Sequence, residues 1–67
     1  MGPSERYLRL TQLAQRAFSH ARLDRALRLF EAAEDEARRL GDRDLADRAF
    51  CNRCVVLLEL ERLDSEG

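Results

Sequence analysis

The sequence predicts an all-α fold of three antiparallel helices, and two patterns support this. Apolar residues recur every three to four positions along three segments, at about 4–20, 24–40 and 43–62, which is the period of one face of a helix. Only two or three residues separate the segments, and such short connections place consecutive helices side by side and antiparallel. The 67 residues provide for a single small domain, spanning 1–67.

The first segment has one apolar face. Either Ser4 is the N-cap or Pro3 occupies the first helical position, and both fit the sequence. His20 closes the segment, where a protonated imidazole would interact favourably with the negative end of the helix dipole. The face follows an i, i+3, i+4, i+7, i+8, i+11 spacing and consists of Leu10, Leu13, Ala14, Ala17, Phe18 and Ala21.

The second segment keeps one apolar stripe over about five turns, without internal Gly or Pro. Asp24 is expected to be its N-cap, and Gly41 the left-handed residue that ends the helix. The acidic residues Glu31, Glu34, Asp35 and Glu36 are expected to form a solvated face. The stripe consists of Leu23, Ala26, Leu27, Phe30, Ala33, Ala37 and Leu40.

The third segment, for which Asp42 offers the N-cap, is apolar nearly all round from Ala49 to Leu60. Such a helix needs neighbours on more than one side, and the first two helices cannot cover it fully. Within the chain, the expected core consists of Leu13, Ala14, Ala17, Ala26, Leu27, Phe30, Ala33, Phe50, Cys54 and Leu57.

Composition and charge argue against several classes of function. The net charge of −1 disfavours a nucleic-acid binder or a polybasic membrane binder, because those concentrate positive charge. The longest apolar run, Cys54 to Leu58, is far too short to span a membrane or to form a signal-peptide core. The chain is therefore predicted to be soluble and cytoplasmic, with neither a nucleic-acid nor a membrane partner.

No residue pattern indicates catalysis, and we predict that the chain is not an enzyme. All 12 basic residues are arginine, as in proteins of GC-rich, bacterial-like genomes, and without lysine there is no Schiff-base chemistry. Cys51 and Cys54 have the C-x-x-C form, but zinc needs about four ligands, and redox motifs of this form lie at a helix N-terminus. These cysteines lie mid-helix and are interpreted as packing residues, with no metal and no cofactor.

An internal repeat is visible when the sequence is compared with itself at an offset of 40 residues. The tripeptide Arg22-Leu23-Asp24 then coincides with Arg62-Leu63-Asp64. Apolar and small positions also coincide, with Leu10 on Phe50, Ala14 on Cys54 and Ala17 on Leu57. A period of 20–50 residues is typical of stacked-repeat architectures.

The order of large, small and aromatic residues resembles the tetratricopeptide repeat family. The first helix of that family's helix-turn-helix unit is matched by Leu10, Leu13, Ala14 and Ala17, and the second by Ala26, Phe30 and Ala33. A second unit would begin with Phe50, Asn52, Cys54 and Leu57. The resemblance covers about residues 7–64.

The chain departs from the family pattern in three places. Arg53 stands where Leu is usual, the turn at residues 21–24 lacks the common Gly, and the closing Pro is absent. The stretch from Glu34 to Asp42 lengthens the second helix, similar to the longer-period members of the family.

The resemblance implies an α-solenoid segment with one whole repeat and the first helix of the next, whose second helix would begin at Leu63-Asp64. The expected function is non-catalytic protein–protein interaction or scaffolding, as part of a longer array. The alternative is a free-standing three-helix protein that self-associates through its third helix.

In the resembled family, peptides bind in a concave groove lined by the first helix of each unit. By position, that groove would present Leu8, Thr11, Gln12 and Gln15 from the first segment, and Arg48, Cys51, Asn52 and Val55 from the third. Arg48 and Asn52 match residue types that hold a peptide carboxylate in chaperone-docking members. Thr11 stands where such a clamp has a basic residue, so the expected partner is a protein or peptide without a more specific assignment.

Overall fold

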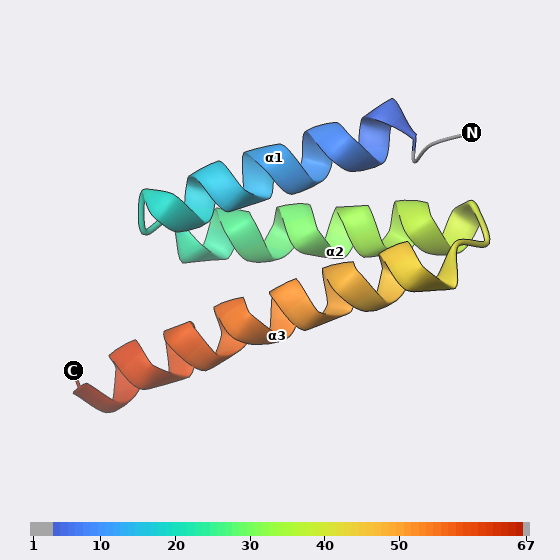
Figure 1. Ribbon diagram of the computed structural model, residues 1–67. Coiled ribbons are helices and arrows are strands. Elements are labelled where there is room, and N and C mark those ends of the chain that lie inside the picture. The colour runs from blue at the N-terminus through green and yellow to red at the C-terminus, as the bar shows by residue number, and fades with distance from the viewer. Residues whose placement is uncertain (1–3, 67) are drawn as a thin grey trace.

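The computed structural model describes residues 4–66, and these form three α-helices without a strand (Figure 1). The helices are α1 (Glu5–Ser19), α2 (Leu23–Arg39) and α3 (Arg43–Glu66), with consecutive helices antiparallel. The predicted all-α fold of three helices is therefore confirmed. Pro3, the alternative start of the first helix, lies outside the described residues.

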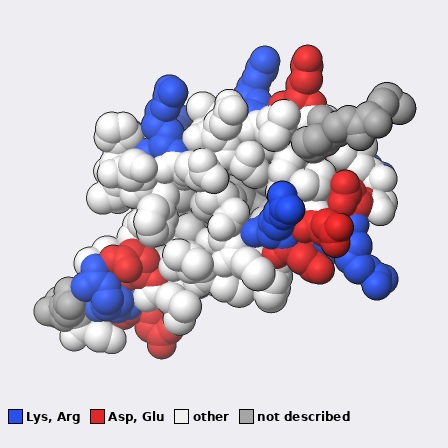
Figure 2. Space-filling model, viewed as in Figure 1, with Lys and Arg blue, Asp and Glu red and all other residues white. Residues whose placement is uncertain are grey.

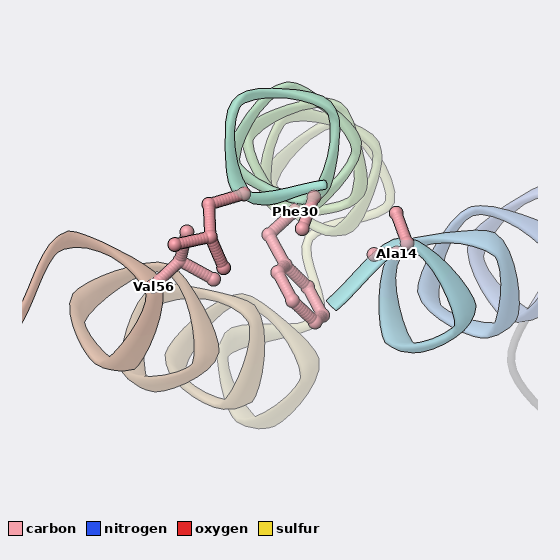
Figure 3. Packing of buried hydrophobic residues seen from close by; sticks show 6 residues of the cluster. Ala14, Phe30 and Val56 are labelled. Carbon is pink, nitrogen blue, oxygen red and sulfur yellow. The ribbon is translucent and has the colours of Figure 1, made fainter. Parts of the chain in front are cut away.

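α2 packs against both of the other helices. Seen along the helix axes, α1 and α3 lie on the same side of α2, and the ring of Phe30 points from α2 into the space between them (Figure 3). α1 and α3 also meet at one end, where the Tyr7 hydroxyl donates a hydrogen bond to the Leu45 carbonyl oxygen at 3.1 Å. The helices thus form a V with α2 at its base.

Three of the predicted helix-end signals lie where the sequence places them. Ser4 is the N-cap of α1, because its Oγ accepts a hydrogen bond from the Tyr7 N–H at 3.0 Å. Asp42 caps α3 in the same way, with Oδ1 accepting from the Leu45 N–H at 3.1 Å. Gly41 has φ 73 and ends α2 in the left-handed conformation.

The prediction of Asp24 as an N-cap is wrong. α2 begins one residue earlier, so that Leu23 enters the core as its first residue and Asp24 lies in the first turn. Arg22 occupies the cap position without a side-chain cap bond. The chain reverses through Ala21, whose φ of 61 is the left-handed conformation that glycine adopts most readily.

α3 is longer than predicted and continues through the second Arg-Leu-Asp tripeptide. The first copy of this tripeptide follows the left-handed Ala21, whereas Glu61 and the residues after it stay helical up to Glu66. No Gly or Pro interrupts residues 43–66. The expectation that another helix begins at Leu63-Asp64 is therefore wrong.

The core forms two clusters along α2. Five of the predicted core residues are buried: Ala14, Ala17, Ala26, Phe30 and Ala33. One cluster joins Ala14, Phe30 and Val56 from the three helices (Figure 3). The other is formed by Tyr7, Ala33, Ala37 and Ala49. Leu27 is half-buried against the first cluster.

Four predicted core positions need correction. Leu13, Phe50 and Leu57 are 43%, 45% and 45% exposed, and Cys54 is only half-buried. The buried side of α3 instead contains Ala49 and Val56. Because α3 is apolar nearly all round, no polar face marks its solvent side. Leu13 lies at the edge of the α1 face that packs on α2.

Glu34 is buried, which corrects the prediction of a wholly solvated acidic face on α2. Its Oε1 lies 3.3 Å from Nε of Arg53 on α3, and its Oε2 lies 2.5 Å from the exposed Arg38 one turn further along α2. The Arg53 guanidinium also lies over the Phe50 ring, 5.1 Å from its centroid. Arg53 thus joins α3 to α2 through an ion pair.

Glu36 is buried on the side of α2 that faces α1. It pairs with Arg39 at 2.7 Å and lies 3.9 Å from Nε of Arg6 on α1. The Ser4 hydroxyl, 3.4 Å away, donates to its other oxygen. The two buried carboxylates therefore link α2 to both neighbours.

Candidate functional site

An open hollow of about 270 Å³ lies between α1 and α3. Its lining contains no charged residue and consists of Gln15, Phe18, Ser19, Phe30, Asn52, Val55 and Val56. The middle of the face seen in Figure 2 likewise carries few charged side chains, which lie mainly around its edges. We call this site the uncharged hollow.

Each helix contributes a different part of the uncharged hollow. Phe30 from α2 and Val56 from α3 are buried and form its floor. Gln15 of α1 and Asn52 of α3 bring two side-chain amides to it. An amide can donate and accept hydrogen bonds, as a peptide group does. Such a site can hold an apolar side chain and bond the polar backbone on either side of it.

The uncharged hollow brings together three of the predicted groove residues, Gln15, Asn52 and Val55. Thr11 and Gln12 do not line it. The Thr11 hydroxyl instead donates to the Leu8 carbonyl oxygen on its own helix at 2.9 Å. Of the two further positions, Leu8 and Cys51, both are exposed and neither lines the hollow.

Arg48 lies near the end where α1 meets α3, outside the lining of the hollow. Burial raises the pKa of the Tyr7 hydroxyl there, while the positive charge of Arg48 opposes this rise and the carboxylate of Asp42 adds to it. Arg48 and Asn52 are thus not placed together as a carboxylate clamp around this hollow.

Four lining residues were not predicted for the groove: Phe18, Ser19, Phe30 and Val56. Phe18 and Phe30 belong to the apolar stripes and were interpreted only as packing residues. The position of Phe30 at the middle of α2 could have identified it as a lining residue, because an aromatic side chain there can fill the space between the two flanking helices.

A larger hollow of about 660 Å³ lies at the α1–α2 turn. Four basic residues line it, namely Arg16, His20, Arg22 and Arg25, over the apolar Leu13, Ala17 and Leu29. All four basic side chains belong to exposed residues, so water solvates them and none is held rigidly by burial.

Among residues 4–66 no group of three or more His, Cys, Asp or Glu side chains is arranged to hold a metal ion. In the same part of the chain, none of the helices has the combination of length and apolar character needed to cross a bilayer. Comparison with known protein families, with curated proteins and with solved structures finds no match.

Proposed function

We propose that the chain is a non-catalytic protein-interaction module that binds a peptide segment of a partner in the uncharged hollow. The observation that supports this most directly is the lining itself, in which the amides of Gln15 and Asn52 accompany an apolar floor. Its volume of about 270 Å³ lies just below the range of about 300–1,000 Å³ typical of small-molecule sites. A single side chain of a protein partner suits it better than a whole cofactor.

We further propose that the organisation is that of a tetratricopeptide-like helical repeat. α1 and α2 form the helix-turn-helix unit, and α3 takes the place of the first helix of the next. The left-handed Ala21 at the turn and the packing of Phe30 between α1 and α3 support this proposal.

Peptides selected from a phage-displayed random library provide the test, with binding measured by fluorescence polarisation. Gln15→Ala and Asn52→Ala should each weaken binding about 3- to 10-fold, the effect of losing one hydrogen bond. Gln12→Ala is the matched control, because Gln12 is an exposed glutamine on α1 that does not line the hollow. An equal loss in all three variants, or no selected peptide, would count against the hollow as the binding site.

A further inference from the structure

One side of α3 carries apolar side chains that the described residues 4–66 leave largely uncovered, with Cys54 half-buried among them. We call this patch the outer stripe, and it consists of Phe50, Cys51, Cys54, Leu57 and Leu58. Leu58 is 65% exposed, the most exposed large apolar residue among those described. Within the stripe, Cys51 and Leu58 lie on the side of α3 away from Ala49 and Val56, whereas Phe50 lies beside α2, with the Arg53 guanidinium over its ring. None of its residues lines the uncharged hollow, so it is a separate surface.

The total surface of the molecule is large for its mass. A compact monomer of 7.8 kDa is expected to expose about 4,400 Å², whereas this chain exposes 5151 Å². The excess of about 750 Å² belongs to the chain as a whole, in which both the outer stripe and the open hollow between α1 and α3 are exposed. The radius of gyration, 12.2 Å, also exceeds the value of about 11 Å for a compact chain of this length.

The outer stripe has the spacing that two crossing helices need. Phe50, Cys54 and Leu58 form a ridge at i±4, and Cys51 and Leu57 lie at i±3 from Cys54. Ridges at i±4 that pack into each other give a helix crossing of about 50°. Cys54, a small residue at the centre, allows the two backbones to approach closely there.

An acidic residue lies at each end of the outer stripe along the helix. Asp47 and Glu61 lie seven residues before and after Cys54, so they fall on the same line of the helix surface. In two helices packed side by side along their length, these carboxylates would face those of the other copy and repel them. In two helices that cross at Cys54, the carboxylates of one copy point away from those of the other and into solvent. The charge pattern therefore favours a crossed pair.

We propose that this surface binds a second copy of the chain, with the two α3 helices crossing at Cys54 on a two-fold axis. Such an axis makes one patch self-complementary, so no second surface is required. Helix axes about 9–10 Å apart would place the two Cys54 Cα atoms about 4.4–5.4 Å apart, within the range for a disulfide. The pairing does not rest on the peptide site proposed above.

Sedimentation equilibrium of the reduced chain tests the pairing, and a mass of twice 7.8 kDa is expected. Leu58→Glu should raise the dimer dissociation constant at least about 30-fold, as loss of a central interface residue does. Circular dichroism should stay unchanged, because Leu58 is exposed. Leu13→Glu is the matched control, since Leu13 is an exposed leucine on another helix, and it should remain dimeric.

Thiol cross-linking provides a second test, first on the unmutated chain and then on two single Cys→Ser variants. Diamide oxidises two thiols to a disulfide and takes up both electrons and both protons. Cys51→Ser should still form the covalent dimer, and Cys54→Ser should not. A monomer at every concentration up to about 1 mM, a dimer that survives Leu58→Glu, or a cross-link through Cys51 alone would each overturn the proposal. The last two outcomes would assign the association to another surface or register.

Discussion

Replacing Phe30 with Ala is expected to remove most of the stability of the fold. Phe30 is 3% exposed and packs at the centre of the cluster that joins all three helices (Figure 3). Truncating a fully buried Phe costs about 3–5 kcal/mol, from the lost transfer free energy and the cavity left behind. A domain of this length has a total free energy of unfolding of about 3–10 kcal/mol.

Phe50→Ala is the matched comparison, because both phenylalanines were predicted for the core. Phe50 is 45% exposed, so its truncation to Ala removes only about half of the transfer free energy of a buried Phe side chain, roughly 1 kcal/mol. Loss of the contact with the Arg53 guanidinium adds about 0.5–1 kcal/mol. The expected cost is therefore about 1–2 kcal/mol, well below that of Phe30→Ala.

Urea unfolding followed by far-ultraviolet circular dichroism measures both costs. The two substitutions are best compared in a Leu58→Glu background, so that self-association through the outer stripe does not contribute to the stability of either. If Phe50→Ala costs as much as Phe30→Ala there, the burial pattern of α3 described above is refuted.

Three further predictions concern the free energy of unfolding of the monomeric chain. Burial raises the pKa of Tyr7 above its ordinary value of 10.0, so above that pH the unfolded state loses its proton first and stability falls as the pH rises. Because the chain has no lysine, the free energy of unfolding of a Tyr7→Phe variant should not fall between about pH 10 and 12. If the free energy of unfolding of the wild type is equally constant over this range, the burial of the Tyr7 hydroxyl is contradicted. Ala21→Gly should raise stability by about 0.5–1 kcal/mol by relieving the left-handed φ of 61, and an unchanged or lower melting temperature would contradict this. Arg53→Leu alone should lower the free energy of unfolding by about 1–3 kcal/mol, because it leaves the buried Glu34 carboxylate with only the exposed Arg38. The Glu34→Leu/Arg53→Leu double variant should regain much of this loss. Additive losses from the two substitutions would argue against the ion pair.

Much of the fold could be predicted because the residues that define it act locally. The apolar spacing of α1 and α2 identifies one face each, and most of that face packs, although Leu13 and Leu40 are exposed. Ser4, Gly41 and Asp42 act on the backbone within four residues of themselves, so the sequence predicts Gly41 and Asp42 and narrows the start of the first helix to Ser4 or Pro3. The end of α3 could not be predicted in this way, because an identical tripeptide starts a helix at residue 22 and continues one at residue 62.

The buried carboxylates and the composition of the uncharged hollow depend on contacts between helices, which the sequence does not report. Glu34 looks like one member of a solvated acidic run until Arg53, 19 positions away in the sequence, is brought to within 3.3 Å of it. Gln15, Asn52 and Val55 share the uncharged hollow because α1 and α3 lie on the same side of α2. Gln12 has the same chemistry as Gln15, and only the rotation of α1 about its axis separates their surroundings.

The distribution of side-chain sizes on α3 gives independent weight to the pairing of two copies. The side that faces α2 contains Ala49 and Val56 with the half-buried Leu45 and Leu60, while Phe50, Leu57 and Leu58 are about half or more exposed. Burial of a Phe or Leu side chain stabilises a fold by about 1.5–3 kcal/mol, considerably more than burial of Ala. The folding of a single chain would thus gain most from the opposite arrangement, with the larger residues inside. The small Ala49 lets α3 approach α2 closely, and the exposure of Phe50, Leu57 and Leu58 is accounted for if these three side chains become buried against a second molecule.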